Sequence, residues 1–249
     1  MRFSSGIVSS LCAALLIGGA SLAVLGQNAA APQTVKVRRA AQPPRVDGKL
    51  DDAVWKDAAR VVLGAALGGP PAEAPTEAWL AYDATHLFLA FRCPDPDIWT
   101  AHRGRDAHMW TEDVVEAFID LDPADPEYVE LEVNPHGDLF DGLFFERHKK
   151  VLMSWNPDIQ VKVVVDGTVD QRGDKDRAWT VEMAIPIGDL TPSSGVGRPG
   201  AAIQPGTTWG LNLYRGERSG NAEKSRLEAW SPVKGDFHET TLFGRIVFE

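Results

Sequence analysis

The stretch VVEAFIDLDPADPEYVELEVN, residues 114–134, decides the fold that this sequence predicts. Apolar side chains alternate with others over the predicted strands Val114–Leu121 and Tyr128–Val133, a period of two that is typical of half-buried strands. The connection between the two runs is short and rich in Asp and Pro, which favours a turn. We therefore expect a β-hairpin whose apolar side chains share one face.

The opposite face of this hairpin gathers polar oxygen-bearing groups. They are Glu116, Asp120, Glu130, Glu132 and Asn134. Such a patch has three interpretations. It can bind a sugar or a cation through its oxygens, it can be a solvated sheet face, or it can supply the two carboxylates of a glycosidase. We rank binding first, the solvated face second and catalysis last.

Comparable β-rich runs recur along the chain and are bounded by turn residues. They are Thr34–Val37, Val61–Leu63, Thr76–Tyr82, Leu87–Cys93, Leu139–Glu146, Ile159–Val165, Trp179–Ile185, Thr207–Tyr214, Arg226–Trp230 and Gly244–Phe248. One short helix is expected at Asp51–Ala59, with Asp51 or Asp52 as its N-cap. Many short strands without helical crossovers predict an all-β, antiparallel sandwich of the jelly-roll kind.

The amino-terminal segment has the pattern of a secretory signal peptide. Arg2 precedes an apolar run over residues 7–25, and small residues follow that run. An uncleaved membrane anchor is the alternative, because about 18 or more apolar residues can span a bilayer. We therefore expect a signal peptide at 1–26, a linker at 27–33 and a single domain at 34–249, in a protein that is secreted or periplasmic.

Composition excludes several classes of protein. The 249 residues carry a net charge of −10, and an acidic chain without a basic stripe is a poor candidate for binding nucleic acid. Cys12 and Cys93 are the two cysteines, so a disulfide scaffold is excluded. The chain contains no Gly-x-Ser-x-Gly, Walker A, His-Glu-x-x-His or Cys-x-x-Cys motif. The sequence therefore does not indicate a serine hydrolase, a P-loop nucleotide site or a zinc site of the common kinds.

The tryptophans divide by context. Those on predicted strands or on the helix are expected in the core, namely Trp55, Trp79, Trp179 and Trp209. Those in polar, loop-like stretches are Trp99, Trp110 and Trp155. A ring at the rim of a sheet offers the apolar face of a pyranose a stacking surface, while nearby carboxylates and amides bind its hydroxyls.

Several blocks of sequence resemble carbohydrate-binding module family 9. They are Val46–Trp55 (VDGKLDDAVW), Tyr82-Asp83 with Leu87–Phe91, Trp110–Asp120, Glu130–Asn134, and Trp230-Ser231-Pro232 followed by Phe237-His238 and Phe243-Gly244. Their order and spacing extend the resemblance over about residues 35–249.

The resemblance implies a β-sandwich that binds the reducing end of a glucan or xylan chain between two aromatic rings. Trp110 matches one of these rings by its position, and Phe237 falls where characterised members of the family have a second Trp. Glu116 and Asn134 match polar ligand-contacting positions, whereas Glu132 stands where such members carry Arg. Because Glu accepts hydrogen bonds and Arg donates them, recognition of the reducing end is expected to be altered or lost.

The predicted ligand-binding residues are therefore Trp110, Glu112, Glu116, Glu132, Asn134 and Phe237, with no catalytic residue and no required cofactor. Members of the family also bind structural Ca²⁺. The acidic turn Asp120-x-Asp122-x-x-Asp125 has oxygen ligands of the kind that Ca²⁺ prefers, although it does not match a complete cation motif.

The leading hypothesis is a secreted, non-catalytic carbohydrate-binding protein that acts in carbohydrate catabolism. The expected partner is a glucan- or xylan-type chain, and a membrane is expected only if the leader is uncleaved. The first alternative is a glycoside hydrolase that uses Glu116, Glu130 and Glu132, which needs one raised and one ordinary carboxyl pKa. A minor alternative is a haem-binding domain of the same sandwich superfamily, with Met109, Met153 or a nearby His as ligands.

Overall fold

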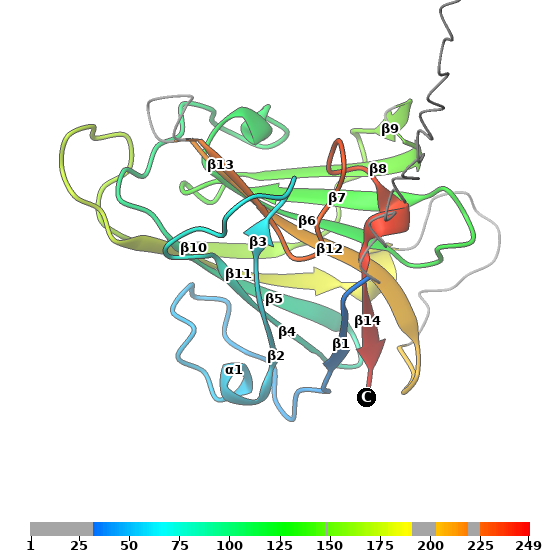
Figure 1. Cartoon of the computed structure of the whole chain (residues 1–249). Coiled ribbons are helices and arrows are strands. Elements are labelled where there is room, and N and C mark those ends of the chain that lie inside the picture. Colours follow the sequence, from blue (N-terminus) through cyan, green and yellow to red (C-terminus); the bar gives the residue numbers. More distant parts are fainter. Residues whose placement is uncertain (1–31, 148, 191–202, 219–224) are drawn as a thin grey trace, which may run out of the picture. The chain divides into compact units, whose positions relative to one another are not determined.

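The computed structural model describes residues 32–147, 149–190, 203–218 and 225–249. From Pro32 to Glu249 the chain forms one compact unit, which contains two β-sheets (Figure 1). The predicted signal peptide and residues 27–31 of the predicted linker lie outside the described residues. Gln33, at the end of that linker, is already attached to the domain, because its side-chain amide donates to the carbonyl of Trp230 (2.7 Å).

The larger sheet has nine strands in the described residues. Its main path runs in the order β1-β14-β12-β6-β7-β8-β9. Two further strands form a branch, in which β13 pairs with β12 and β3 pairs with β13. The bounds are β1 Thr34–Val37, β3 Gly64–Ala65, β6 Val114–Asp120, β7 Tyr128–Val133, β8 Leu139–Glu146, β9 Lys150–Leu152, β12 Thr208–Glu217, β13 Arg226–Ala229 and β14 Gly244–Phe248. The edge strand β1 runs parallel to its neighbour β14, and the other paired strands described in this sheet run antiparallel.

The smaller sheet has five strands in the order β10-β11-β5-β4-β2, all antiparallel. Their bounds are β2 Ala59–Val62, β4 Glu77–Tyr82, β5 His86–Pro94, β10 Gln160–Asp166 and β11 Ala178–Pro186. The described helical segments are α1 Val54–Asp57 and the 3₁₀ turns η1 Met109–Thr111, η2 Ile187–Leu190 and η4 Thr240–Leu242. None of these is long and apolar enough to cross a membrane. The predicted all-β sandwich is therefore confirmed.

The predicted helix is shorter than expected. It spans one turn at α1 instead of Asp51–Ala59, and Ala59 already belongs to β2. The N-cap is Ala53, which makes no side-chain cap, so the prediction of Asp51 or Asp52 as cap is wrong. The carboxyl group of Asp52 instead accepts the backbone N–H of Arg45 (2.7 Å). An upstream loop therefore uses the side chain that would have capped a longer helix.

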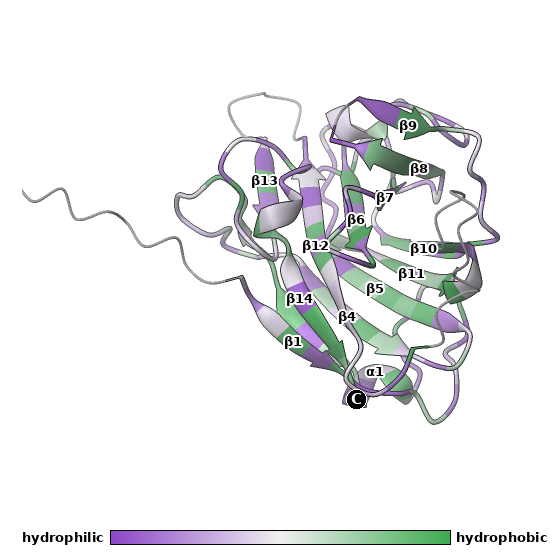
Figure 2. Cartoon of the chain, turned by 90° about the vertical axis from the view of Figure 1, so that its right-hand side faces the viewer, coloured by the Kyte–Doolittle hydropathy of each residue, from purple (hydrophilic) through white to green (hydrophobic). Residues whose placement is uncertain are grey.

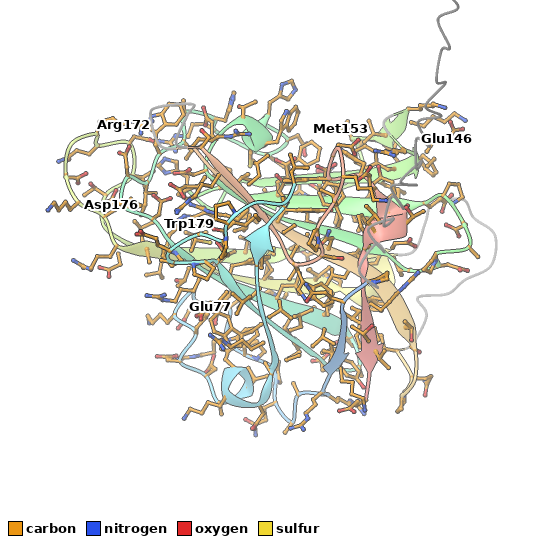
Figure 3. All side chains as sticks on the ribbon, in the orientation of Figure 1. Glu77, Glu146, Met153, Arg172, Asp176 and Trp179 are labelled. Carbon is orange, nitrogen blue, oxygen red and sulfur yellow. The ribbon has the colours of Figure 1, made fainter. Side chains whose placement is uncertain are left out.

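The core lies between the two sheets. Alternate side chains of β6 and β7, such as Val115, Ala117 and Leu131, point into it and meet apolar side chains of β5 and β11. Figure 2 shows the corresponding bands of hydrophobic and hydrophilic residues along β12 and β14. Trp179 is fully buried in this core (Figure 3), as is Trp209. The period-two pattern therefore divides each strand into a core face and an outer face.

Glu182, on the outer face of β11, fastens the segment before α1 to the smaller sheet. One carboxyl oxygen accepts the N–H groups of Asp47 (2.8 Å) and Gly48 (2.7 Å). The other accepts the N–H of Leu50 (3.2 Å) and the indole N–H of Trp55 (2.7 Å). Four donors that would otherwise need partners thus share one carboxyl group.

The same segment needs glycine at position 48. Gly48 has φ +84°, and a Cβ atom there would lie 2.8 Å from the Cγ2 of Val164. A side chain would therefore meet both an unfavourable backbone conformation and β10. Contacts with β10 and β11 therefore account for the presence of Gly48 and Trp55 in this block of sequence.

We predict that Glu182→Gln lowers the free energy of unfolding by about 3 kcal/mol, because two oxygens that accept four donors are replaced by one oxygen and one competing donor. Urea unfolding followed by tryptophan fluorescence measures this loss. Glu77→Gln is the matched control, since Glu77 forms a surface ion pair with Arg60 and is expected to contribute less than about 1 kcal/mol. Equal losses in the two variants would contradict the assigned role of Glu182.

Candidate functional site

The outer face of the larger sheet carries the predicted polar patch in two neighbouring rows. Strand pairing aligns one row across β12, β6, β7 and β8, and a second row beside it. The first row is Tyr214, Glu116, Glu132 and Phe140, and the second is Asn212, Phe118, Glu130 and Gly142. The predicted β6–β7 hairpin and its shared carboxyl face are therefore present in the structure.

This face is not solvated. Glu116, Glu130 and Glu132 are 3 %, 6 % and 0 % exposed. Segments around η1, β9, β13 and residues 235–238 surround them and leave a cavity of about 710 Å³ above the sheet. The cavity is lined by Leu67, His108, Trp110, Glu116, Phe118, Glu130, Phe140, Phe144, Val151, Met153, Arg218, Leu227, Gly235, Asp236, Phe237 and His238. Met153 lies on the side of the larger sheet that faces away from the smaller one (Figure 3).

Aromatic rings form the walls of this cavity. Trp110, in η1, is 43 % exposed, and its ring stacks on His108 with centroids 4.6 Å apart and meets Phe140 edge-on at 6.0 Å. Phe237 stacks on Tyr214 at 3.9 Å, with the planes 8° apart. Because Tyr214 covers one face of Phe237, only the opposite face or the edge of that ring can contact a ligand.

The structure brings three of the six predicted residues to the cavity surface, namely Trp110, Glu116 and Phe237. Glu112 does not line it. One oxygen of Glu112 accepts the Thr100 hydroxyl (2.7 Å) and the backbone N–H groups of Ala101 (2.6 Å) and His102 (3.0 Å). This carboxyl group therefore holds the loop before η1.

The other two predicted residues lie beneath or beside the cavity. The side-chain oxygen of Asn134 accepts the N–H groups of His136 and Asp138, both at 3.0 Å, and its amide donates to the carbonyl of His102 (3.2 Å). Its polar atoms are thus used within the β7–β8 turn. Glu132 is opposite Glu116 in the sheet and is fully buried. The role of each of the six residues in ligand binding stays a prediction.

Burial perturbs the carboxyl groups of the cavity floor. It raises the pKa of Glu130 to about 7 and the pKa of Glu116 well above its usual range. The neighbouring Glu130 raises the pKa of Glu116 further, whereas Arg218 lowers it. The pKa of Glu132 is also raised, first by burial and then by Glu116 and Glu130. The carboxyl groups of Glu130 and Glu132 are close enough to shift each other's pKa, although neither oxygen of Glu132 has a hydrogen-bond partner of ordinary geometry among the described residues.

The sequence analysis missed several lining residues, and some of them had a readable signal. Phe140 and Phe144 alternate along β8, which pairs with β7, so their side chains share the face of Glu130. Gly142 lies between them, and a Cβ atom there would lie 3.1–3.4 Å from Phe144, Val151 and Phe140. By contrast, no local pattern places Arg218 at the cavity, because it follows the end of β12 in a loop.

The other two loop tryptophans have partners elsewhere. The guanidinium group of Arg172 lies over the ring of Trp99, 4.7 Å from its centroid. The indole N–H of Trp155 donates to the carbonyl of Asp189 (3.2 Å), and its ring packs against the main core. Trp110 is therefore the member of this group that the structure brings to the cavity.

The acidic turn after β6 uses its carboxyl groups within the turn. Asp120 accepts the N–H of Asp122 (3.1 Å), Asp122 accepts the N–H of Ala124 (3.1 Å), and Asp125 accepts the N–H of Glu127 (3.0 Å). Among the described residues, no group of three or more His, Cys, Asp or Glu side chains is arranged to hold a metal ion. The turn thus offers no support for structural Ca²⁺, which remains an untested prediction.

The two methionines of the haem alternative do not meet. Met109 is fully buried in a small cluster with Val114 and Phe140, whereas Met153 is exposed and lines the cavity. The space between the two sheets is filled by the hydrophobic core. The arrangement of these side chains therefore does not favour a paired methionine site.

A known family model matches this chain. The family described as "Carbohydrate family 9 binding domain-like" matches residues 46–249, which is most of the chain. The chain belongs to this family. The expected resemblance is thus confirmed, and with it the assignment of the chain as a carbohydrate-binding module of family 9.

Several known proteins are similar to this family 9 module at low sequence identity. A crystal structure of a Bacteroides uniformis protein matches with a TM-score of 0.68 and 16 % identity, over 88 % of this chain and 100 % of that one. A family 9 module of Caldicellulosiruptor kristjanssonii, solved with cellotriose, matches with a TM-score of 0.60 and 16 % identity, over 87 % and 94 % of the chains. A protein of Arthroderma benhamiae described as extracellular is 25 % identical over 178 residues, 68 % of this chain and 76 % of that protein.

We predict that the free energy of unfolding of this module falls as pH rises from about 4.5 to about 7. In this window the unfolded chain has lost protons that the folded Glu130 still holds, so the unfolded state is favoured as pH rises. Glu130→Gln should reduce the fall by about 3 kcal/mol, as a shift from 4.5 to about 7 implies. Urea unfolding at pH 4.5 and pH 8 measures this difference.

Glu146→Gln, which changes a partly exposed glutamate at the end of β8, serves as the control for this pH dependence. It should keep the wild-type fall in stability. If Glu130→Gln also keeps the full fall, the carboxyl group of Glu130 is not the buried acid that the structure indicates.

Proposed function

We propose that the cavity above the larger sheet binds the terminal unit of a glucan- or xylan-type oligosaccharide without cleaving it. One observation carries the proposal. An exposed ring, Trp110, and a second ring, Phe237, line the same cavity as the buried carboxyl group of Glu116. Aromatic walls and a few oriented polar groups are the usual composition of a sugar site.

The division of work between these residues follows from their chemistry. The apolar C–H face of a pyranose packs against the Trp110 ring, which removes apolar surface of both from water. Glu116 accepts hydrogen bonds from sugar hydroxyls in a place that water reaches poorly, where an unmade hydrogen bond is costly. Arg218, which also lines the cavity, supplies donors for ring or hydroxyl oxygens.

The comparisons support this class of ligand. Family 9 modules of Caldicellulosiruptor kristjanssonii have been solved with cellotriose and with glucose. For the present chain the choice between glucan and xylan, and the recognition of a chain end, are parts of the proposal. Glu132 places a buried carboxyl group opposite Glu116, where the family resemblance implies an arginine, so a preference for the reducing end is expected to be weakened.

The carboxyl groups give binding more support than hydrolysis. A glycosidase pair needs one acid with a raised pKa and one carboxylate with an ordinary pKa. Burial raises the pKa values of Glu116, Glu130 and Glu132 alike. No two of them therefore form a pair with one raised and one ordinary pKa. A hydrolytic pair is therefore not assigned to this patch.

We predict that Trp110→Ala weakens binding of cellotriose or xylotriose at least fivefold, which is about 1 kcal/mol for the lost ring contact. Isothermal titration calorimetry with cello-, xylo- and manno-oligosaccharides, each with native and reduced ends, measures the affinities. Trp99→Ala is the control, since that ring lies under Arg172. Unchanged affinity in Trp110→Ala would remove the stacking contact, and no binding of any sugar would overturn the proposal.

The proposal also places the protein outside the cytoplasm, in carbohydrate catabolism. Its support is the signal-peptide pattern of residues 1–26 and the Arthroderma benhamiae relative described as extracellular. We expect the exported protein to begin near residue 27 when its amino terminus is sequenced. An exported protein that begins at Met1 would favour the membrane-anchor alternative instead.

A further inference from the structure

The floor of the cavity gathers more carboxyl groups than the surrounding basic groups can pair with. Glu116 and Glu130 line the cavity and are at least nine-tenths buried, and no backbone, hydroxyl, amide or guanidinium group among the described residues donates a hydrogen bond to either of them. Both oxygens of Glu132, which lies opposite Glu116 on the neighbouring strand, also have no hydrogen-bond partner of ordinary geometry among the described residues. Buried carboxyl groups usually receive such bonds. Three adjacent carboxyls without them indicate that a donor comes from outside the chain.

The basic groups near this floor do not supply that donor. Arg218 acts on Glu116 through its charge, but its described hydrogen bond goes to the carbonyl of Trp110 (3.4 Å). The remaining titratable groups that line the cavity are His108, His238 and Asp236. Asp236 pairs with Arg147. Three carboxyls therefore face a single guanidinium group among the described residues of the site.

The missing donor is better matched by an organic cation than by a metal ion. No described group of three or more acidic, His or Cys side chains is arranged as a metal site. The walls are instead aromatic, with Trp110, Phe140, Phe144 and Phe237 around the acidic floor. Aromatic faces attract ammonium groups, and an ammonium group has three N–H donors for carboxyl oxygens. A neutral hydroxyl would bring one donor and no charge.

We propose that the sugar unit preferred by this cavity carries a free amine, and that its ammonium group binds Glu116 and Glu130 while its ring stacks on Trp110. This inference rests on the proposed carbohydrate-binding function and changes its preferred ligand: the favoured unit is an amino sugar, such as a glucosamine unit in a β-1,4 chain, and a neutral glucan or xylan unit binds more weakly. The positive charge of the bound ammonium group stabilises the deprotonated forms of Glu116 and Glu130. A carboxyl that held a proton in the empty cavity then releases it.

The test compares three trisaccharides of similar size that differ at C2: the β-1,4 trimer of glucosamine, its N-acetylated form and cellotriose. Calorimetry at pH 6.5, in two buffers with different ionisation enthalpies, gives both the affinity and the number of protons exchanged. We expect the amine trimer to bind at least tenfold more tightly than the other two, with net proton release. The preference should shrink as salt is raised, because it depends on charge.

Variants locate the ammonium group. In Glu130→Gln and Glu116→Gln the ratio of amine-trimer to cellotriose affinity should fall at least fivefold, whereas Glu146→Gln should keep the wild-type ratio. A ratio that is unchanged in both cavity variants would overturn the assignment. The comparison of the three sugars on the wild-type protein keeps the inference testable if a variant does not fold.

The outcomes separate this inference from the proposed function. Cellotriose that binds as tightly as the amine trimer, or more tightly, overturns the preference for an amine and leaves carbohydrate binding supported. If no trisaccharide binds, the proposed function itself fails, and the inference fails with it.

Discussion

The register between β6 and β7 is the constraint on which both the core and the cavity depend. Pairing of Val115 with Val133 and of Glu116 with Glu132 directs valines inward and glutamates outward. Because side chains alternate with a period of two, a slip of one residue would bring the carboxyls into the core. Burial of the apolar face therefore determines the outward position of Glu116 and Glu130, and the chemistry of the cavity follows from the packing of the sandwich.

Both outer faces of the sandwich are covered, but in different ways. On the smaller sheet, Glu182 satisfies four donors and Trp55 packs beside it, so the covering segment is closely fitted. On the larger sheet, the cover leaves a cavity over carboxyls that lack hydrogen-bond donors among the described residues. Buried groups of this kind reduce stability unless a ligand satisfies them. The contrast between Glu182 and Glu116 supports the proposal that the cavity on the larger sheet is the functional site.

Most of the fold was readable from local sequence. The period-two runs predicted β1, β7, β8 and β14 at their observed bounds, because alternation is a direct consequence of burial on one face. The helix was overestimated, since local propensity does not reveal that Asp52 is used by a loop. Of the six predicted ligand residues, Trp110, Glu116 and Phe237 meet at one cavity, whereas Glu112 and Asn134 hold loops and Glu132 is buried opposite Glu116.

The sequence by itself determined the sandwich, the family and the face on which the carboxyl groups gather, since each follows from alternation along single strands or from local motifs. Tertiary structure decided whether that face is solvated or enclosed, and which rings stand over it. Arg218, Phe140 and Phe237 reach one cavity from three separate segments, and no local sequence pattern predicts that these three segments come together. The exposure of a carboxyl group, and hence its pKa and its need for a donor, depends on distant chain segments that cover it.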